Sequence, residues 1–439
     1  MNRDLNPTHD PQLRSWISSA NQPGTDFPIQ NLPFGVFQRR DQPQESRIGV
    51  AIGDRILDLH QCYRSGHLQN LPEVLQQACA ESSLNPLMAL GPWSVAMLRP
   101  LLQNLLRADC PPPRLSEDLL LQDLQVEMQI PATIGDYTDF YASLFHATHV
   151  GSLLRPHNPL LPNYKHLPIA YHGRSSSLLL SGRPIPRPQG QRKGADEPYP
   201  HFGATQALDY EMEVGFLVGQ GNALGKPIPI AQAESAIFGL CLVNDWSARD
   251  IQAWEYQPLG PFLGKSFATS LSPWVVTLEA IAPFRCPAFT RLAEDPPLLP
   301  YLSCFDNAKQ GGIDLTVEVW LQSALMKDQG IQALRLSQAN FQDMYWTLAQ
   351  MVAHHTSNGC NLRSGDLLAS GTISGAEEGS QGSLLEITRR GAQPFELPSG
   401  EQRRFLQDGD EITLRGYCRR AGYVDIGLGL CQAQITASI

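Results

Sequence analysis

The chain has 439 residues, of which 42% are hydrophobic and 17% are charged, and its formal net charge is −10. The charged share is below the usual figure of about 25%, which predicts a large, well-buried globular chain and excludes disorder as its main state. An acidic balance without a long basic run excludes nucleic acid as a partner.

The cysteines and the hydropathy indicate the cellular compartment. The nine cysteines are odd in number, and none lies in a CxxC pair. No stretch approaches the ~18 consecutive apolar residues of a membrane span. The first ten residues lack the apolar core of a signal peptide. We therefore expect a reduced, cytoplasmic protein without a membrane partner.

The first third of the sequence predicts a small β unit followed by helices. Residues 1–33 are predicted to form a loose entry segment with one short helix, of which residues 1–26 form a surface extension. Strands are predicted at 35–37, 47–52 and 55–59, and helices at 72–80 and 93–106. Pro100 interrupts the second helical pattern. The prolines at 111–113 mark a composition break, and we place the first domain boundary between them and Pro131.

Beyond Pro131 the sequence predicts mostly short strands separated by turns, which is typical of a mainly β (α+β) protein. Residues 208–214 alternate strictly between polar and apolar, and residues 236–243 form an almost wholly apolar run that predicts a buried strand. One helix is predicted from a cap at Asn340, with Gly359 just past its end, and it is expected to cover one side of a sheet.

Carboxylates gather in this strand-rich part. In a regular strand Asp209, Glu211 and Glu213 would share one face, for which an ordinary solvated face is the alternative interpretation. Asp245 follows the predicted buried strand, and Asp139 lies in an upstream segment with a second acid and two tyrosines. Hard oxygen donors without a competing cysteine set favour Ca²⁺ or Mg²⁺ over Zn²⁺. Without a cation, converging carboxylates ~4 Å apart would repel by roughly 4 kcal/mol per pair.

A lysine in a glycine-rich segment adds a positive charge. Lys265 is one of only six lysines, and it follows Gly264 in an otherwise apolar stretch. Such a lysine is either part of a site or a surface lysine whose stem covers apolar residues.

These segments resemble the fumarylacetoacetate hydrolase family. The matching segments occur in order at 31–35, 135–141, 146–148, 167–174, 244–252, 260–266, 358–363 and 370–375. The resemblance implies a small N-terminal SH3-like β-barrel domain with its preceding extension over residues 1–130. It further implies a large C-terminal catalytic domain over residues 131–439, built as a mixed β-roll, and a homodimer.

The resemblance also implies the reaction and the metal ligands. The reaction would be metal-dependent hydrolysis of a carbon-carbon bond of 4-fumarylacetoacetate to fumarate and acetoacetate, the last step of tyrosine and phenylalanine breakdown. One Ca²⁺ or Mg²⁺ would be bound by Asp139, Glu211, Glu213 and Asp245. Lys265 and Thr269 match positions that the family associates with a further cation. Because an ammonium group cannot coordinate a metal, we assign Lys265 to proton donation and oxyanion stabilisation.

The remaining roles are carried over in the same way. His146 matches the general base, and Glu386 matches the carboxylate that orients it. The oxyanion would be stabilised by Arg249, Gln252 and Lys265. Residues matching substrate contacts are Tyr141, Arg155, Tyr171, Gln252, Tyr256 and Thr372.

The sequence departs from the family pattern beside the base. Leu144 and Phe145 stand where more polar residues are expected, and His149 stands where asparagine is expected. These departures concern the polarity of the pocket and not the reaction.

Two alternative functions remain. One is a related enzyme that hydrolyses or decarboxylates other oxo-acids, such as acylpyruvates, on the same metal site. The other is a non-catalytic, metal-stabilised protein that binds small diacids.

Overall fold

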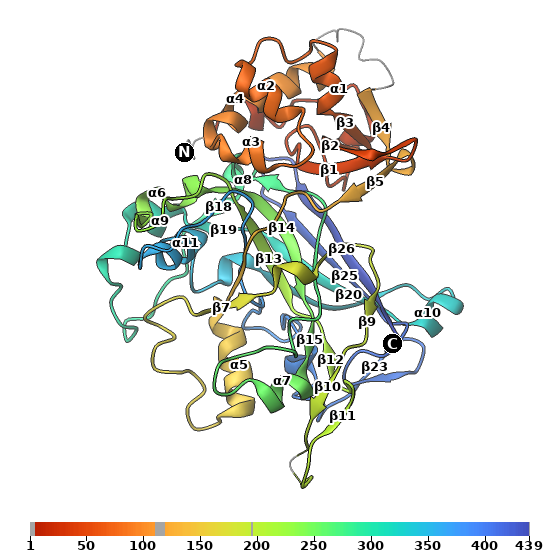
Figure 1. The fold of residues 1–439 in the computed structure, drawn as a ribbon, viewed down its shortest axis with the longest axis vertical. Helices are drawn as coiled ribbons and strands as arrows, with labels where there is room; N and C mark the ends of the chain where they lie inside the picture. Colours follow the sequence, from red (N-terminus) through yellow and green to blue (C-terminus); the bar gives the residue numbers. More distant parts are fainter. Residues whose placement is uncertain (1–4, 110–118, 195, 439) are drawn as a thin grey trace.

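A computed structural model describes residues 5–109, 119–194 and 196–438. Figure 1 shows a smaller N-terminal part above a larger C-terminal part that is built around long strands. The prolines at 111–113 and Cys110 lie outside the described residues.

The N-terminal part contains one antiparallel sheet with helices packed beside it. The sheet has five strands in the order β4-β3-β2-β1-β5. Its strands are β1 (Phe34–Arg39), β2 (Gln42–Ile52), β3 (Arg55–Asp58), β4 (Leu120–Gln122) and β5 (Val126–Gln129). The helices are α1 (Leu59–Arg64), α2 (Glu73–Cys79), α3 (Asn85–Ala89) and α4 (Pro92–Leu106). The predicted strands and both predicted helices are confirmed.

Pro100 does not interrupt α4, contrary to the prediction. The helix continues through Pro100 to Leu106. An internal proline removes only its own N–H donor and crowds the preceding turn. Leu98 and Leu102 on either side of it are fully buried, and their packing keeps the helix continuous.

The described part of the N-terminal extension, residues 5–26, is partly buried and not wholly a surface segment. It contains two 3₁₀ helices, Pro7–His9 and Ser18–Asn21, and Thr8 and His9 are buried. The guanidinium of Arg99 on α4 donates to Thr8 Oγ1 at 2.9 Å, to the carbonyl of Asn31 at 2.7 Å and to the carbonyl of Gln30. Burial lowers the pKa of Arg99 to about 10. Arg99 therefore anchors this segment, and its residues Ile17 and Ala20 join the core of the N-terminal part.

The C-terminal part is organised by a mixed sheet of eight strands. Seven of them follow the order β7-β6-β22-β13-β14-β16-β8, and the eighth, β17, pairs with β14. Their bounds are β6 (Tyr137–Phe140), β7 (Ala170–Gly173), β8 (Leu178–Leu180), β13 (Met212–Val218), β14 (Ile237–Asp245), β16 (Thr269–Leu271), β17 (Val276–Thr277) and β22 (Leu367–Ala369). The predicted buried strand is confirmed as β14, all of whose residues are buried.

A second sheet packs beside β14, and shorter elements complete this part. It has the order β21-β20-β25-β26-β9, with β9 (Ile185–Pro186), β20 (Thr316–Gln322), β21 (Leu334–Asn340), β25 (Glu411–Cys418) and β26 (Ile426–Thr436). Two-stranded pairs are β10 (Gln189–Arg192) with β11 (His201–Ala204), β12 (Leu208–Asp209) with β15 (Ser247–Ala248), β18 (Arg285–Cys286) with β19 (Gly312–Ile313), and β23 (Phe395–Glu396) with β24 (Gln402–Arg403). The helices are α5 (Leu144–Leu154), α6 (Ile230–Ala233), α7 (Arg249–Glu255), α8 (Leu278–Ile281), α9 (Phe305–Gln310), α10 (Ala324–Asp328), α11 (Leu348–Thr356) and α12 (Leu384–Ile387).

The predicted helix from Asn340 begins later than predicted. Asn340 caps a separate 3₁₀ turn, Phe341–Asp343, and the α-helix begins after Thr347, whose side chain accepts from the Gln350 N–H. Two caps compete in this segment, and the apolar residues between them pack against the core without helical hydrogen bonds. The helix ends at Thr356, so Gly359 lies beyond it.

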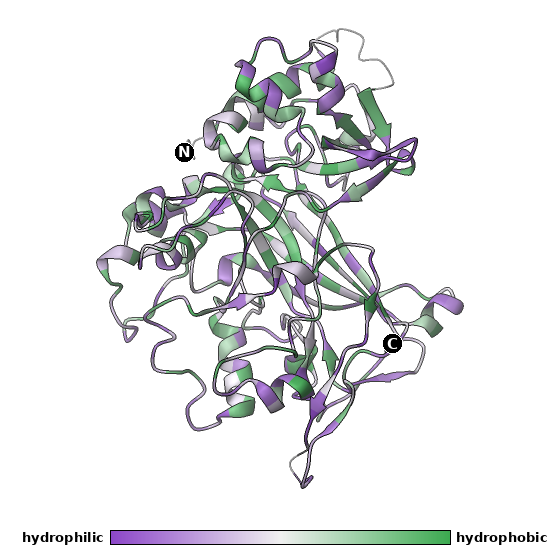
Figure 2. Ribbon diagram, viewed as in Figure 1, coloured by the Kyte–Doolittle hydropathy of each residue, from purple (hydrophilic) through white to green (hydrophobic). Residues whose placement is uncertain are grey.

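The hydropathy pattern agrees with this layered architecture. In Figure 2 the central strands carry many apolar residues, whereas the outer end of the β1–β2 hairpin is hydrophilic. The exposed residues 42–45 form that hairpin end. Trp246 and Trp346 are among the largest fully buried side chains. The overall architecture is therefore an α+β fold of mixed sheets.

We expect Arg99→Met to lower the free energy of unfolding by about 3 kcal/mol, because the buried carbonyls of Gln30 and Asn31 lose their donor. Urea unfolding followed by tryptophan fluorescence measures the change, since Trp16 donates to the Leu105 carbonyl in the same segment. Arg64→Met on the exposed side of α1 is the control, with an expected change below about 0.5 kcal/mol. Equal effects of the two substitutions would contradict the proposed anchoring.

Candidate active site

Three strand ends meet at one end of the eight-stranded sheet. β13 and β14 are antiparallel, with Met212 opposite Asn244, so the start of β13 lies beside the end of β14. β6 runs parallel to β22, with Asp139 opposite Ala369, and β22 is antiparallel to β13. The end of β6 therefore reaches the same place.

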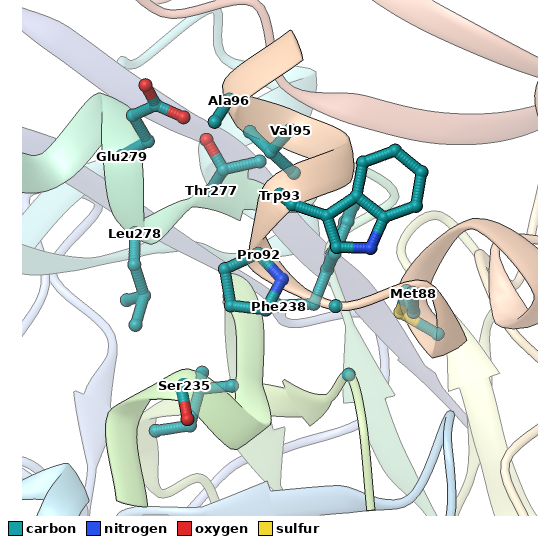
Figure 3. Close-up of a pocket in the computed structure, with 13 residues that line it drawn as sticks. Met88, Pro92, Trp93, Val95, Ala96, Ser235, Phe238, Thr277, Leu278 and Glu279 are labelled. Carbon is teal, nitrogen blue, oxygen red and sulfur yellow. The ribbon is translucent and has the colours of Figure 1, made fainter. Parts of the chain in front are cut away.

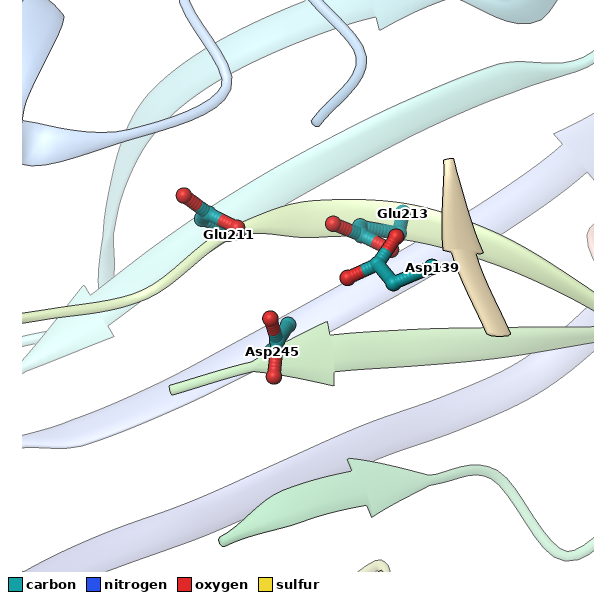
Figure 4. A group of neighbouring side chains, drawn as sticks. All are labelled: Asp139, Glu211, Glu213 and Asp245. Carbon is teal, nitrogen blue, oxygen red and sulfur yellow. The ribbon is translucent and has the colours of Figure 1, made fainter. Parts of the chain in front are cut away.

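Four carboxylates converge there, as Figure 4 shows. One oxygen from each of Asp139, Glu211, Glu213 and Asp245 lies within 4.8 Å of the others, and all four residues are buried. We call this group the carboxylate cluster. The loop after β22 packs closely against the end of β6, because a Cβ at Gly371 would lie 2.1 Å from the Phe140 carbonyl oxygen. The sheet topology thus brings together residues that are more than 100 positions apart.

The predicted strand 208–214 is interrupted, and this separates Asp209 from the cluster. β12 ends at Asp209, and β13 begins at Met212. Asp209 instead accepts from Arg249 Nε at 2.9 Å and from the backbone N–H groups of Leu384 and Leu385. The solvated-face interpretation is wrong, since Asp209, Glu211 and Glu213 are all buried.

Two cluster members lack neutralising partners among the described residues. Asp139 Oδ1 and both carboxylate oxygens of Glu213 are buried without a hydrogen-bond donor. Burial and repulsion from Asp245 raise the pKa of Asp139 well above its usual range, and burial and repulsion from Asp139 do the same for Glu213. Buried, unpaired carboxylate oxygens of this kind fit a divalent cation with oxygen ligands.

The other two members are paired with cations. Lys265 Nζ contacts Glu211 and donates to Asp245 Oδ2 at 2.7 Å, and Arg249 Nη1 donates to Glu211 Oε1 at 2.8 Å. Burial would raise the pKa of Glu211, but Lys265 and Arg249 outweigh it and lower the pKa to about 2. Lys265 is therefore a buried lysine of the site and not a surface lysine.

Hydroxyl groups hold two of the carboxylates in place. Thr269 Oγ1 donates to Asp245 Oδ1 at 2.8 Å, and the Tyr171 hydroxyl donates to Asp245 Oδ2 at 2.7 Å. The Tyr137 hydroxyl donates to Asp139 Oδ2 at 3.2 Å. Tyr137 is not among the predicted site residues, although it stands two residues before the predicted ligand Asp139 in the same strand.

A histidine–carboxylate pair lies on the short helices beside the cluster. His146 Nδ1 is 2.7 Å from Glu386 Oε2, and both side chains are buried. Glu386 Oε2 also accepts from Ser374 Oγ at 3.0 Å and from Ser383 Oγ at 2.9 Å. Burial would raise the pKa of Glu386, but His146 and these donors hold it well below its usual range. An ionised Glu386 requires the proton of neutral His146 on Nδ1, so Nε2 carries the free electron pair.

The structure also reveals contacts of Glu386 that the sequence did not suggest. Ser374 and Ser383 were not predicted, because single serines carry no distinguishing pattern. His149 Nδ1 is 2.9 Å from Glu386 Oε1. His149 thus contacts the carboxylate beside His146, which the sequence did not indicate, and the prediction that it affects only the polarity of the pocket stays a prediction.

The matched substrate residues lie in three different settings. Tyr141 packs edge-on against the His146 ring with centroids 5.3 Å apart, and Thr372 is buried in the loop after β22. Arg155 ends α5 and has a buried Nε without a partner. Tyr256 ends α7 and is 40% exposed. Gln252, one turn earlier on α7, accepts from Arg249 Nη1 at 3.3 Å.

A well-formed cavity elsewhere contains none of these residues. It has a volume of about 270 Å³ and lies at the junction of the two parts, between the start of α4 and β14 with α8. Figure 3 shows Trp93 and Val95 on one side of it and Thr277 and Leu278 on another. Its lining is mainly apolar and includes one carboxylate, Glu279. The candidate active site is therefore defined by its charged groups and not by this cavity.

Comparison with known families agrees with the site. Residues 137–436 match the family described as fumarylacetoacetate (FAA) hydrolase C-terminal, and residues 30–131 match the family described as fumarylacetoacetase N-terminal. The chain belongs to the fumarylacetoacetate hydrolase family, and it is an enzyme of the hydrolase class.

The curated relatives narrow this class to one kind of enzyme. The chain is 48% identical to the fumarylacetoacetase of Homo sapiens, across 94% of this chain and 97% of the human protein. It is 45% identical to the fumarylacetoacetase of Arabidopsis thaliana, across 97% and 99% of the two chains. A solved fumarylacetoacetate hydrolase from Exiguobacterium antarcticum has a TM-score of 0.51 at 18% identity, covering 92% of this chain and 99% of its own. That similarity supports the fold.

The lengths of the helices and the state of the cysteines bear on where the protein could reside. Within the described ranges, no helix is both long and apolar enough to cross a membrane. The eight described cysteines are free thiols.

Chelation should destabilise the protein more at pH 8 than at pH 5. In the ion-free folded state the pKa values of Asp139 and Glu213 are raised, whereas these groups titrate near about 4 in the unfolded chain. The folded state thus binds these protons more tightly, and its stability falls as the pH rises above about 4 towards the raised values.

Thermal unfolding with chelator and with added Ca²⁺ or Mg²⁺ measures this difference. Glu213→Gln is the matched control, because it removes one repelling charge and should reduce the loss of stability at pH 8 without the ion. Equal unfolding temperatures with chelator and with either ion at pH 8 would refute the cation site.

Proposed function

We propose that this chain hydrolyses a carbon-carbon bond of 4-fumarylacetoacetate and releases fumarate and acetoacetate, the last step of tyrosine and phenylalanine breakdown. The observation that carries the proposal is the His146–Glu386 pair, at 2.7 Å, on the helices beside the carboxylate cluster. Family membership and the high coverage of the curated relatives support it.

The proposed cofactor is one Ca²⁺ or Mg²⁺ ion bound by Asp139, Glu211, Glu213 and Asp245. The unpaired oxygens of Asp139 and Glu213 support this assignment, because both ions prefer carboxylate oxygens. The ion would act as a Lewis acid towards the oxygens of the β-diketone. The second cation predicted near Lys265 and Thr269 stays a prediction; both side chains contact Asp245.

His146 is proposed to remove a proton from water through Nε2. Glu386 accepts from Nδ1 and stabilises the imidazolium that forms. The resulting hydroxide attacks the carbonyl carbon on the fumaryl side, and a tetrahedral oxyanion forms. Proton removal of this kind typically contributes about 10² to 10⁴ in rate.

Arg249, Gln252 and Lys265 are proposed to stabilise the oxyanion. Arg249 has a suitable free group, since its Nη2 is buried without a partner while Nε and Nη1 are held by Asp209 and Glu211. Preorganised donors of this kind are typically worth ~3 to 4 kcal/mol each. Collapse of the oxyanion breaks the carbon-carbon bond, and Lys265 is proposed to protonate the acetoacetate carbanion.

The substrate is proposed to be oriented by Tyr141, Arg155, Tyr171, Tyr256 and Thr372. Arg155 is the candidate for a terminal carboxylate, because its unpartnered buried Nε leaves a donor for an anion. Tyr141 lies against the His146 ring and would help to align the adjacent carbonyl. Tyr171 donates to Asp245 and so contacts the carboxylate cluster.

The alternative is a related enzyme that hydrolyses or decarboxylates other oxo-acids, such as acylpyruvates. The observation that favours it is the carboxylate cluster itself, because a cation bound there would polarise any neighbouring pair of carbonyl oxygens. The substrate-contacting residues would then decide which acyl group is accepted.

The finer architecture and location are proposed as well. We infer that the N-terminal sheet is an SH3-like barrel, that the catalytic domain is a β-roll, and that the domain boundary lies at residues 130 and 131; the two separate family matches support the division. A cytoplasmic location is supported by the free thiols, because reduced cysteines are typical of that compartment.

A homodimer is proposed through the surface around α7. Exposed apolar side chains occur on the β10–β11 hairpin and after α7, where Phe202 is 73% and Leu259 is 97% exposed. The two segments are in contact, since Trp254 Nε1 donates to Gln191 Oε1 at 3.3 Å. Apolar groups of this size on one surface commonly mark an interface.

Light scattering of the purified protein should give twice the mass of one chain, and Phe202→Glu should shift it towards a single chain. Leu124→Glu, at a side chain that is 84% exposed in the N-terminal part, is the control and should leave the mass unchanged. A single-chain mass for the unsubstituted protein would refute the homodimer.

The reaction is tested by the fall in ultraviolet absorbance of fresh 4-fumarylacetoacetate, with both products identified. We expect fumarate and acetoacetate in equal amounts, loss of turnover with chelator and recovery with Ca²⁺ or Mg²⁺. Cleavage of an acylpyruvate alone would favour the alternative enzyme, and no turnover of either compound would refute both enzymatic functions.

Two substitutions separate the roles within the site. His146→Ala should lose about 10² or more in turnover while the protein stays folded and binds the ion. Asp245→Ala should abolish ion binding, measured as calcium stoichiometry. Near-normal turnover of the first variant or unchanged stoichiometry of the second would contradict the assigned roles.

A further inference from the structure

The carboxylate of Glu386 forms hydrogen bonds with two histidines, one at each oxygen. His146 Nδ1 lies 2.7 Å from Oε2, and His149 Nδ1 lies 2.9 Å from Oε1. Both histidines belong to α5, whose bounds are Leu144–Leu154. Residues three positions apart on a helix face the same side. α5 therefore presents two imidazoles to a single carboxylate.

The donors around Glu386 are distributed unequally. Oε2 accepts from His146, Ser374 and Ser383, whereas His149 is the one donor to Oε1 among the hydrogen bonds of the described residues. The Glu386 side chain is only 1% exposed, so water cannot readily replace a lost donor on Oε1. Without His149, Oε1 would be a buried and unpaired charged oxygen.

We propose that His149 is a positioning residue of the general base. Its Nδ1–H donates to Glu386 Oε1 and fixes the rotation of the carboxylate, so that Oε2 stays directed at His146. The proposal rests on the function proposed above, in which His146 is the base.

The physical reason is the softness of the carboxylate torsion. The terminal torsion of a glutamate side chain is broad and has no sharp staggered minima. Rotation about the Cγ–Cδ bond moves both oxygens at once, so a donor on Oε1 opposes any rotation that would turn Oε2 away from His146. His149 performs this task from a ring that is 33% exposed at the side-chain level and is held by the same helix as His146.

The proposal distinguishes a hydrogen-bond role from a packing role. His149→Phe keeps a planar ring of similar size but removes the donor. His149→Asn shortens the side chain but keeps an N–H donor. A positioning role therefore predicts that asparagine replaces His149 better than phenylalanine, and a packing role predicts the opposite order.

Steady-state kinetics with 4-fumarylacetoacetate should show this order. We expect His149→Phe to lower kcat about tenfold, as for the loss of one hydrogen bond to a charged group, with KM changed less than about twofold because His149 is not among the proposed substrate contacts. His149→Asn should keep kcat within about twofold of the unsubstituted enzyme. A kcat of His149→Phe equal to or above that of His149→Asn would overturn the proposal. His149→Leu serves as the donor-free variant if the phenylalanine variant does not fold.

A second readout does not depend on turnover. Nitrogen-15 NMR of the imidazoles should show His146 protonated at Nδ1 in a strong hydrogen bond, and His149→Phe should weaken or broaden that proton signal. An unchanged His146 signal in the variant would overturn the positioning role. If the unsubstituted enzyme fails to hydrolyse the substrate, the proposed function fails, and this spectrum still decides the role of His149.

Discussion

Repulsion among four buried carboxylates is the physical constraint on which the rest of the site depends. The cluster exists because three strand ends meet at one end of a sheet and each contributes acids that water does not reach. The charges are compensated unevenly. Glu211 and Asp245 are neutralised by Lys265 and Arg249, whereas Glu213 has no donor on either oxygen. The positive charges of the protein therefore lie beside Glu211 and Asp245. The unpaired oxygens of Asp139 and Glu213 remain available to a cation.

Asp209 connects this charged side to His146, the proposed general base. It accepts from Arg249 Nε and also from two backbone N–H groups at the start of α12, the helix that carries Glu386. The backbone break between β12 and β13 is what frees Asp209 for this position. One buried carboxylate thus fixes the distance between the guanidinium and the pair formed by His146 and Glu386. For this reason, the effects on turnover of substituting Arg249 and of substituting His146 or Glu386 are expected to be non-additive.

Much of the site could be predicted from the sequence, because long ordered motifs carry both residue types and spacing. The buried strand ending at Asp245 follows directly from its apolar run, and α2 and α4 of the N-terminal part follow from their periodicity. The failures have a common cause in long-range packing. Alternation at 208–214 does not reveal the break after Asp209, and the sequence cannot show that Arg99 buries the segment around Thr8. Nor can it show that His149 turns towards Glu386, since that contact joins residues 237 positions apart.

The position of β26 has a consequence for the order in which the molecule forms during synthesis. β26 lies between β25 and β9 in the second sheet and packs near β14, the strand that ends at Asp245. Its partner β9 is made some 250 residues earlier, at residues 185–186, and pairs with Ile435 and Thr436. Nearly the whole described chain must therefore be synthesised before β26 can complete the second sheet, which packs beside β14. Until then β14 lacks its neighbour in the second sheet, and the apolar residues of that layer remain exposed to solvent during synthesis.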